Sequence, residues 1–256
     1  MALMKTSNPA LGSDTFRDAA GSRFGGAIDV TTRMTMSGTV NKTAILLLCA
    51  VATAAWTWHL FLTSGMAEVA PLMTLGFIGG FILAMVTVFK KEWSPVCAPL
   101  YALLEGLALG GISAMVDQRY HGIAMEAVGL TFATLFVMLF LYKARIIKVT
   151  RKFMFGVVAA TGGIMVFYLV EWVLSIFHFN PFGVLNGNGA IGIGFSLLVV
   201  GIAALNLVLD FAFIEQGVNY GVPKYMEWYG AFGIMVTLVW LYLEMLRLLT
   251  KVNSRG

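Results

Sequence analysis

Five acidic side chains occur inside long apolar stretches of this chain, where charged residues are rare. They are Glu105, Glu126, Glu171, Asp210 and Glu244. A charged side chain at the centre of a bilayer costs about 3 kcal/mol on insertion scales, so such a group faces a bundle interior or water. Glu126 and Glu171 lie near the ends of their stretches, where a solvated position is the simpler interpretation. The other three are candidates for binding protons or cations.

Asp210, Glu244 and Glu105 carry the functional hypothesis. Asp210 lies in ALNLVLDFAFIEQG, and Asn206 is one helical turn earlier on the same face, where it can hydrogen-bond the carboxylate. Glu244 lies near the middle of LVWLYLEMLRLL, and Arg247, three residues later, is its alternative structural partner. Glu105 lies near mid-depth in PLYALLEGLALGGIS, where a structural hydrogen bond to a neighbouring helix is the alternative to a functional role.

The chemistry expected of these acids follows from their lack of basic neighbours. No Lys or Arg lies deep in the apolar stretches, so counter-charge must come from protons, a metal cation or a second acid that shares a proton. Two carboxyl groups in one site titrate as a coupled pair. Once deprotonated, their oxygens suit Ca²⁺, which tolerates irregular coordination. We expect Asp210 and Glu244 to form such a pair and to be the candidate Ca²⁺ ligands. The three histidines show no zinc-ligand spacing.

The elements that position these acids are long apolar helices. Of 256 residues, 59% are hydrophobic and 12% are charged, whereas soluble domains carry about a quarter charged residues. The apolar runs have the length of a bilayer crossing, about 20 residues. Because lipid offers the backbone no hydrogen-bond partner, we predict an all-α integral membrane protein, a bundle of seven transmembrane helices. The predicted spans are 43–63, 69–89, 95–116, 123–142, 153–177, 191–214 and 230–250.

Basic residues indicate how the bundle is oriented. We expect residues 1–41 to form a flexible cytoplasmic tail, 42–252 the seven-helix domain and 253–256 a short tail. Of the 17 Lys and Arg residues, 13 fall on the side of the N-terminus and 4 on the other. The positive-inside rule therefore predicts a cytoplasmic N-terminus. The basic C-terminal residues disagree mildly, which leaves open a last helix that enters and returns, or an eighth membrane segment.

Several functional classes are disfavoured by the same sequence. The net charge of +4 reflects basic residues along one membrane face, where they meet anionic lipid, so we expect no nucleic-acid partner. The glycine clusters predict close helix packing rather than a phosphate loop. Cys49 and Cys97 are expected to be small apolar residues without a disulfide. An HExxH motif, a second Asp in the last helix and a mid-membrane His for Ser196 are all missing, so we expect no enzyme and no resident cofactor.

The motifs of the last two helices resemble a known family. ALNLVLDFAFIEQG followed by LVWLYLEMLRLL resembles the bacterial branch of the transmembrane Bax inhibitor motif family, and YALLEGLALGGIS resembles its Glu-Gly-Leu segment. The likeness covers roughly residues 40–250. It implies seven helices with the last one central, and a carboxylate pair that corresponds to Asp210 and Glu244. The Glu-Gly-Leu acid corresponds to Glu105. The chain departs from the family by carrying Glu rather than Asp in the last helix.

The resemblance also implies a function. It points to a pH-sensitive Ca²⁺ leak across the cell inner membrane, closed when the carboxylate pair is protonated and opened when it is not. Its partners would be the lipid bilayer and Ca²⁺ or H⁺, with Ca²⁺ as the permeant ion. The alternative is a membrane scaffold that binds and modulates other membrane proteins, such as a quality-control protease, with the N-terminal tail as its contact arm.

Overall fold

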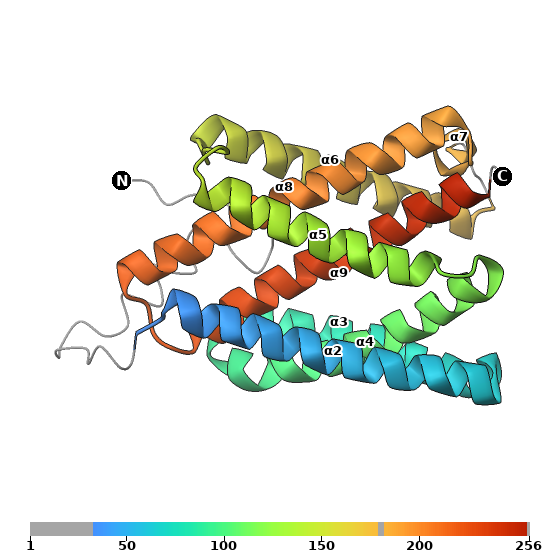
Figure 1. The fold of residues 1–256 in the computed structure, drawn as a ribbon, viewed down its shortest axis with the longest axis horizontal. Coiled ribbons are helices and arrows are strands. Elements are labelled where there is room, and N and C mark those ends of the chain that lie inside the picture. Colours follow the sequence, from blue (N-terminus) through green and yellow to red (C-terminus); the bar gives the residue numbers. More distant parts are fainter. Residues whose placement is uncertain (1–32, 179–181, 255–256) are drawn as a thin grey trace.

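The computed structural model describes residues 33–178 and 182–254, which fold into a bundle of long helices (Figure 1). Seven of these helices are long and apolar enough to cross a membrane, which confirms the predicted all-α, seven-span architecture. They are α2 (Met36–Ser64), α3 (Met66–Phe89), α4 (Ser94–Arg119), α5 (Ile123–Lys143), α6 (Arg151–Ile176), α8 (Ala190–Tyr220) and α9 (Met226–Asn253). Two short elements, η2 (Lys91–Trp93) and α7 (Gly183–Asn186), lie in connections.

The first long helix begins earlier than its hydrophobicity predicts. The Thr35 side chain caps α2 by accepting a hydrogen bond from the Gly38 amide at 3.0 Å, so the helix starts at Met36 rather than at 43. The Met34 amide donates to the Val222 carbonyl at 2.8 Å. Residues 33–41, which we predicted to belong to a flexible tail, are therefore part of the bundle. Residues 1–32 of the predicted tail lie outside the described residues.

A single residue joins α2 to α3. Gly65 has φ of +80°, a conformation that a residue with a Cβ rarely adopts. This one position lets the chain reverse within one residue, so α2 and α3 lie beside each other as an antiparallel pair.

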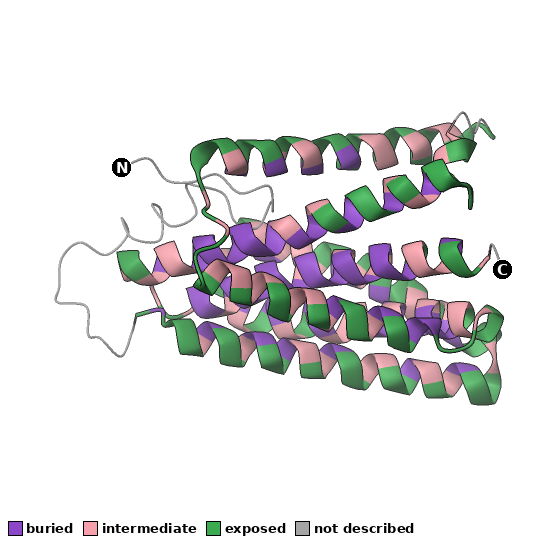
Figure 2. Ribbon diagram, turned by 45° about the horizontal axis from the view of Figure 1, so that its top comes forward, coloured by how far each residue is buried: buried purple, intermediate pink, exposed green. Residues whose placement is uncertain are grey.

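The last helix occupies the centre of the bundle. In Figure 1, α9 crosses the middle of the bundle, with α2 on one side and α8 on the other, and it packs on α2, α4, α5 and α8. Within the most apolar 18-residue windows, 72% of α8 and 67% of α9 are buried, against 17–28% of α2, α3, α5 and α6. Figure 2 shows the same concentration of buried residues on the inner helices. The expectation of a central last helix is confirmed.

The two ends of the bundle are distinguished by the direction of α9. This helix is continuous over 28 residues, or about 42 Å at 1.5 Å per residue, so the alternative of a last helix that enters and returns is wrong. Both α2 and α9 begin at one end of the bundle, called here the tail end, and finish at the other, called the far end (Figure 1).

Close contact between α2 and α4 depends on two glycines of α4. A Cβ added at Gly106 would lie 2.9 Å from the Ala50 carbonyl carbon, and one at Gly110 would lie 2.7 Å from the Ala54 Cα. Small residues of this kind let membrane helices bring their backbones together. The predicted packing role of the glycines is thus realised at this pair of helices.

Gly106→Ala should destabilise the protein by about 2 kcal/mol, because overpacking of a tight contact forces backbone shifts. Gly162→Ala is the matched control, since a Cβ there would meet nothing within 4 Å. The measurement is the unfolding temperature of the two variants in the same detergent. Equal unfolding temperatures would contradict a tight α2–α4 contact.

Candidate functional site

Asp210 lies in the middle of the bundle, at the contact between α8 and α9. Its side chain is 0% exposed, and the Thr237 hydroxyl of α9 donates to its Oδ2 at 2.6 Å. Leu207 and Ile214, one turn to either side on α8, are also buried. The carboxyl group is therefore a polar position in an apolar helix contact, shielded from lipid as predicted for an intramembrane acid.

Asn206 connects α8 to α6. Its Nδ2 donates to Thr161 Oγ1 at 2.8 Å and to the Ile202 carbonyl at 2.9 Å. An amide nitrogen has two protons to donate, and both have acceptors here. The sequence indicated that Asn206 can hydrogen-bond Asp210 one turn away; the two acceptors of its Nδ2 protons are instead the Thr161 hydroxyl and the Ile202 carbonyl.

Glu244 belongs to a polar cluster closer to the far end. It is 2% exposed and accepts a hydrogen bond from the Tyr168 hydroxyl at 3.0 Å. Arg247 forms an ion pair with it at 3.2 Å, and the guanidinium carbon lies 4.9 Å from the centre of the Tyr168 ring. Arg247 is therefore the counter-charge of Glu244, the alternative that the sequence had left open.

The predicted direct pair of Asp210 and Glu244 is wrong. Asp210 is bonded to Thr237, which precedes Glu244 by seven residues on α9, or about 10 Å along the helix axis. Because α8 and α9 are antiparallel, the residue of α8 level with Glu244 is near Ala203 rather than Asp210. The two acids are separate positions at different depths, each with its own partners.

Glu105 occupies a third place, at the contact between α3 and α4. It is half-buried, and its carboxylate lies over Gly80 of α3, where an added Cβ would be 2.9 Å from Oε2. Glycine at that position leaves room for the acid. The structure therefore does not bring Glu105 together with either Asp210 or Glu244.

The two acids assigned to helix ends differ from each other. Glu126 is exposed in the first turn of α5, in agreement with a solvated position. Glu171 is half-buried and accepts a hydrogen bond from Asn186 of α7. Near it, Lys251 is buried and donates to the Leu185 and Gly192 carbonyls at 2.8 and 3.2 Å. From the sequence, Lys251 was counted with the basic residues at the C-terminus; in the structure it makes hydrogen bonds within the fold.

An ion pair at the tail end of the bundle, whose acid is buried, was not predicted from the sequence. Glu227, in the first turn of α9, is 0% exposed and is bonded to Lys42 of α2. Its Oε1 also accepts from the Thr35 amide at 2.9 Å and the Thr35 hydroxyl at 2.8 Å. The sequence contained a signal for this pair: both helices begin at the same membrane face, so an acid in the first turn of α9 and a base in the second turn of α2 can meet.

No ready-made metal site exists among the described residues. Residues 33–178 and 182–254 contain no group of three or more His, Cys, Asp or Glu side chains that could hold a metal ion. Asp210 has the Thr237 hydroxyl as a partner, and Glu244 has Arg247. Cys49 and Cys97 are free thiols, as expected.

A family model described as Bax inhibitor 1 like matches residues 8–254. Neither a search of curated proteins nor a search of solved structures found a match. The matched region includes all seven long helices, so the likeness extends over the whole bundle rather than one motif.

Proposed function

The chain belongs to the Bax inhibitor 1 like family, and on that premise we propose that it is a pH-sensitive cation leak of the cell inner membrane, with Asp210 as its protonation-controlled position. The observation that carries the proposal is the complete burial of Asp210 on a central helix, where a hydroxyl of the neighbouring helix holds it. An acid in such a place is retained against an insertion cost of about 3 kcal/mol.

The proposed mechanism uses one carboxylate at a time. Deprotonated Asp210 offers oxygen ligands, which with the Thr237 hydroxyl, backbone carbonyls and water suit a passing Ca²⁺ ion. Protonation removes the charge that attracts the cation, so the flux of cations falls at low pH. Glu244, neutralised by Arg247, lies on α9 as a second position toward the far end. Ca²⁺ is the permeant ion that we favour, with H⁺ as the alternative.

Orientation in the membrane is part of the same proposal. The N-terminus is placed in the cytoplasm, with the tail end of the bundle facing inward. Two of the four basic residues counted on the opposite side, Arg247 and Lys251, are bonded to Glu244 and to backbone carbonyls. Because these two side chains make contacts within the protein, we give them little weight when basic residues are counted to assign orientation.

Flux through proteoliposomes is the test. Purified protein in vesicles should release Ca²⁺ above the rate of protein-free vesicles, and the rate should rise between about pH 6 and about pH 8 as carboxyl groups lose their protons. Parallel assays with K⁺ and H⁺ identify the permeant ion. The alternative, a membrane scaffold acting on other membrane proteins, predicts no protein-dependent flux of any of the three ions, and that result would overturn the leak.

A further inference from the structure

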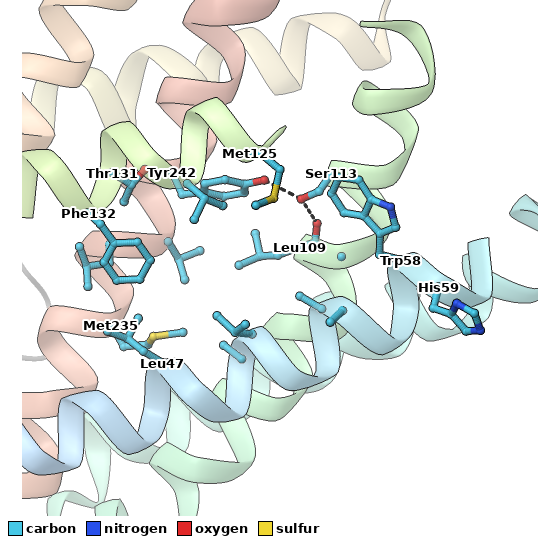
Figure 3. Close-up of a pocket in the computed structure, with 18 of the residues that line it drawn as sticks. Leu47, Trp58, His59, Leu109, Ser113, Met125, Thr131, Phe132, Met235 and Tyr242 are labelled. Atoms are coloured by element: carbon cyan, nitrogen blue, oxygen red, sulfur yellow. Dashed lines mark hydrogen bonds between the residues drawn. The ribbon is translucent and has the colours of Figure 1, made fainter. Parts of the chain in front are cut away.

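A crevice opens on the side of the bundle between α2 and α5, away from the acids. Its volume is about 470 Å³. α2 and α5 do not pack against each other, and α9 and α4 form the floor between them (Figure 3). Val51 and Leu62 of α2 and Met125 of α5 line its rim and are 53%, 70% and 68% exposed. The crevice is therefore accessible from the side of the bundle, where lipid lies.

The length of the crevice exceeds one leaflet of the membrane. It extends along α2 from Leu47 to Leu62, about 22 Å at 1.5 Å per residue. One leaflet contributes about 15 Å of hydrocarbon to a bilayer core. Leu62 lies two residues from the end of α2, and Leu47 lies beyond the midpoint of the apolar segment 43–63. The crevice thus runs from the far-end interface past the bilayer centre.

Polar side chains gather at the interfacial end of the crevice. His59, Ser113 and Tyr242 lie there, while Leu47, Phe132 and Met235 line the deep end (Figure 3). Thr131, beside Phe132, donates its hydroxyl proton to the Ala127 carbonyl of its own helix. The lining thus changes from mostly polar at the interface to mostly apolar at the deep end, which matches a lipid molecule that lies parallel to the helices.

The hydroxyl pair selects the chemistry of the head group. Ser113 and Tyr242 are 6% and 8% exposed, and their oxygens are 2.6 Å apart. Ser113 donates its only proton to the Leu109 carbonyl, so Tyr242 must donate to Ser113. Both protons are then used, and the pair can only accept further hydrogen bonds. The acid Asp117 lies one turn beyond Ser113 on α4, where its Oδ1 accepts a hydrogen bond from the Gly122 amide at 2.8 Å.

We propose that this crevice binds one acyl chain of a membrane lipid whose head group carries N–H donors, with the head at the Ser113–Tyr242 pair and the chain directed toward Met235. A protonated amine in the head group satisfies the acceptors of the hydroxyl pair and the negative charge of Asp117. Phosphatidylethanolamine has this chemistry, whereas phosphatidylcholine has the same net charge without N–H donors. The inference does not depend on ion flux.

Quenching of Trp58 fluorescence by brominated lipid tests the proposal, because Trp58 lines the crevice. The probes are phosphatidylethanolamine and phosphatidylcholine with brominated acyl chains, titrated into vesicles that contain the protein. The Trp58-dependent signal is the quenching measured for the unmodified protein minus the quenching measured for Trp58→Phe. We expect it to saturate with phosphatidylethanolamine at about a fivefold lower lipid fraction than with phosphatidylcholine, as expected for one net hydrogen bond.

Variants separate the chain site from the head site. Ala55→Phe fills the crevice from its exposed rim and should abolish the Trp58-dependent signal, whereas Ala52→Phe, equally exposed but outside the crevice, should leave it unchanged. The double variant Ser113→Ala/Tyr242→Phe should keep the signal and lose the preference for phosphatidylethanolamine. Equal signals from the Ala55 and Ala52 variants, or no lipid preference in the unmodified protein, would overturn the proposal.

Discussion

Asp210→Asn should reduce cation flux through proteoliposomes by about a hundredfold. A carboxylate offsets the cost of placing a cation at the bilayer centre, about 3 kcal/mol, and its loss therefore corresponds to about two orders of magnitude in rate. Asparagine has the same shape and keeps an oxygen that can accept the Thr237 hydroxyl proton. The substitution thus removes the charge and leaves the α8–α9 contact in place.

The pH dependence of flux should disappear in the same variant. In the unmodified protein, acid protonates Asp210 and removes its charge, so flux falls as the pH is lowered. Asparagine carries no charge at any pH, and the variant should match the protonated protein throughout. Glu126→Gln is the control, because Glu126 is exposed at the start of α5 and its substitution changes the net charge by the same amount as Asp210→Asn. A pH profile of Asp210→Asn that follows the unmodified protein would contradict a gating role.

Flux through Asp210→Asn, Glu244→Gln and the double variant shows whether the two acids act at separate sites or as one shared site. The two acids have different partners and differ in depth by about 10 Å, measured along the axis of α9. The free energies by which the two substitutions reduce flux should therefore add in the double variant. A carboxylate pair that shared one proton would behave as a unit, and the second substitution would then add little. Non-additive effects would restore the direct pair that the structure separates.

Helix number was predictable from the sequence for a physical reason, whereas the central place of the last helix was implied by the family resemblance. A bilayer crossing requires an uninterrupted apolar run, and lipid tolerates little else, so seven runs give seven helices. The last helix also carries polar and small residues that lipid disfavours, such as Glu244 and Gly233. Both are buried in the structure, as a central helix requires.

Depth within the membrane was not predictable, because the helices extend beyond their apolar segments. The predicted span 191–214 is the helix Ala190–Tyr220, and the predicted span 43–63 begins at Met36. An error of several residues moves a side chain by a large part of a leaflet, at 1.5 Å per residue. Register between α8 and α9 is set by packing, which places Thr237 rather than Glu244 beside Asp210.

The largest stability effect is expected at the tail end, from Glu227→Gln. Glu227 is 0% exposed and bonded to Lys42 and to the Thr35 amide and hydroxyl. The Lys42 ammonium also lies 5.5 Å from the centre of the Trp228 ring. Removing one member of a buried ion pair leaves the other charge without compensation, which costs about 3 kcal/mol. Its unfolding temperature in detergent should therefore fall by about 6 to 12 °C, at 2–4 °C per kcal/mol for a chain of this size.

Variants of both partners distinguish the ion pair from simple packing. Lys42→Met should also destabilise the protein, because Glu227 then has no basic partner from α2. The double variant Lys42→Met/Glu227→Gln should be more stable than Glu227→Gln alone, since no unpaired charge remains and glutamine still offers an oxygen to Thr35. Lys143→Met is the control, because Lys143 is exposed at the end of α5. Costs that simply add in the double variant would show that Lys42 and Glu227 do not interact.

This ion pair also places a constraint on any opening of the bundle. Lys42 is on α2 and Glu227 on α9, and residues 33–35 are bonded both to Glu227 and to the connection between α8 and α9. The start of α2 therefore holds the two helices that carry Asp210 and Glu244 at the tail end. If cations pass along the α8–α9 contact, weakening this attachment should ease the separation of the helices. Glu227→Gln should then raise flux at the same time as it lowers the unfolding temperature, whereas a purely structural pair would lower the unfolding temperature alone.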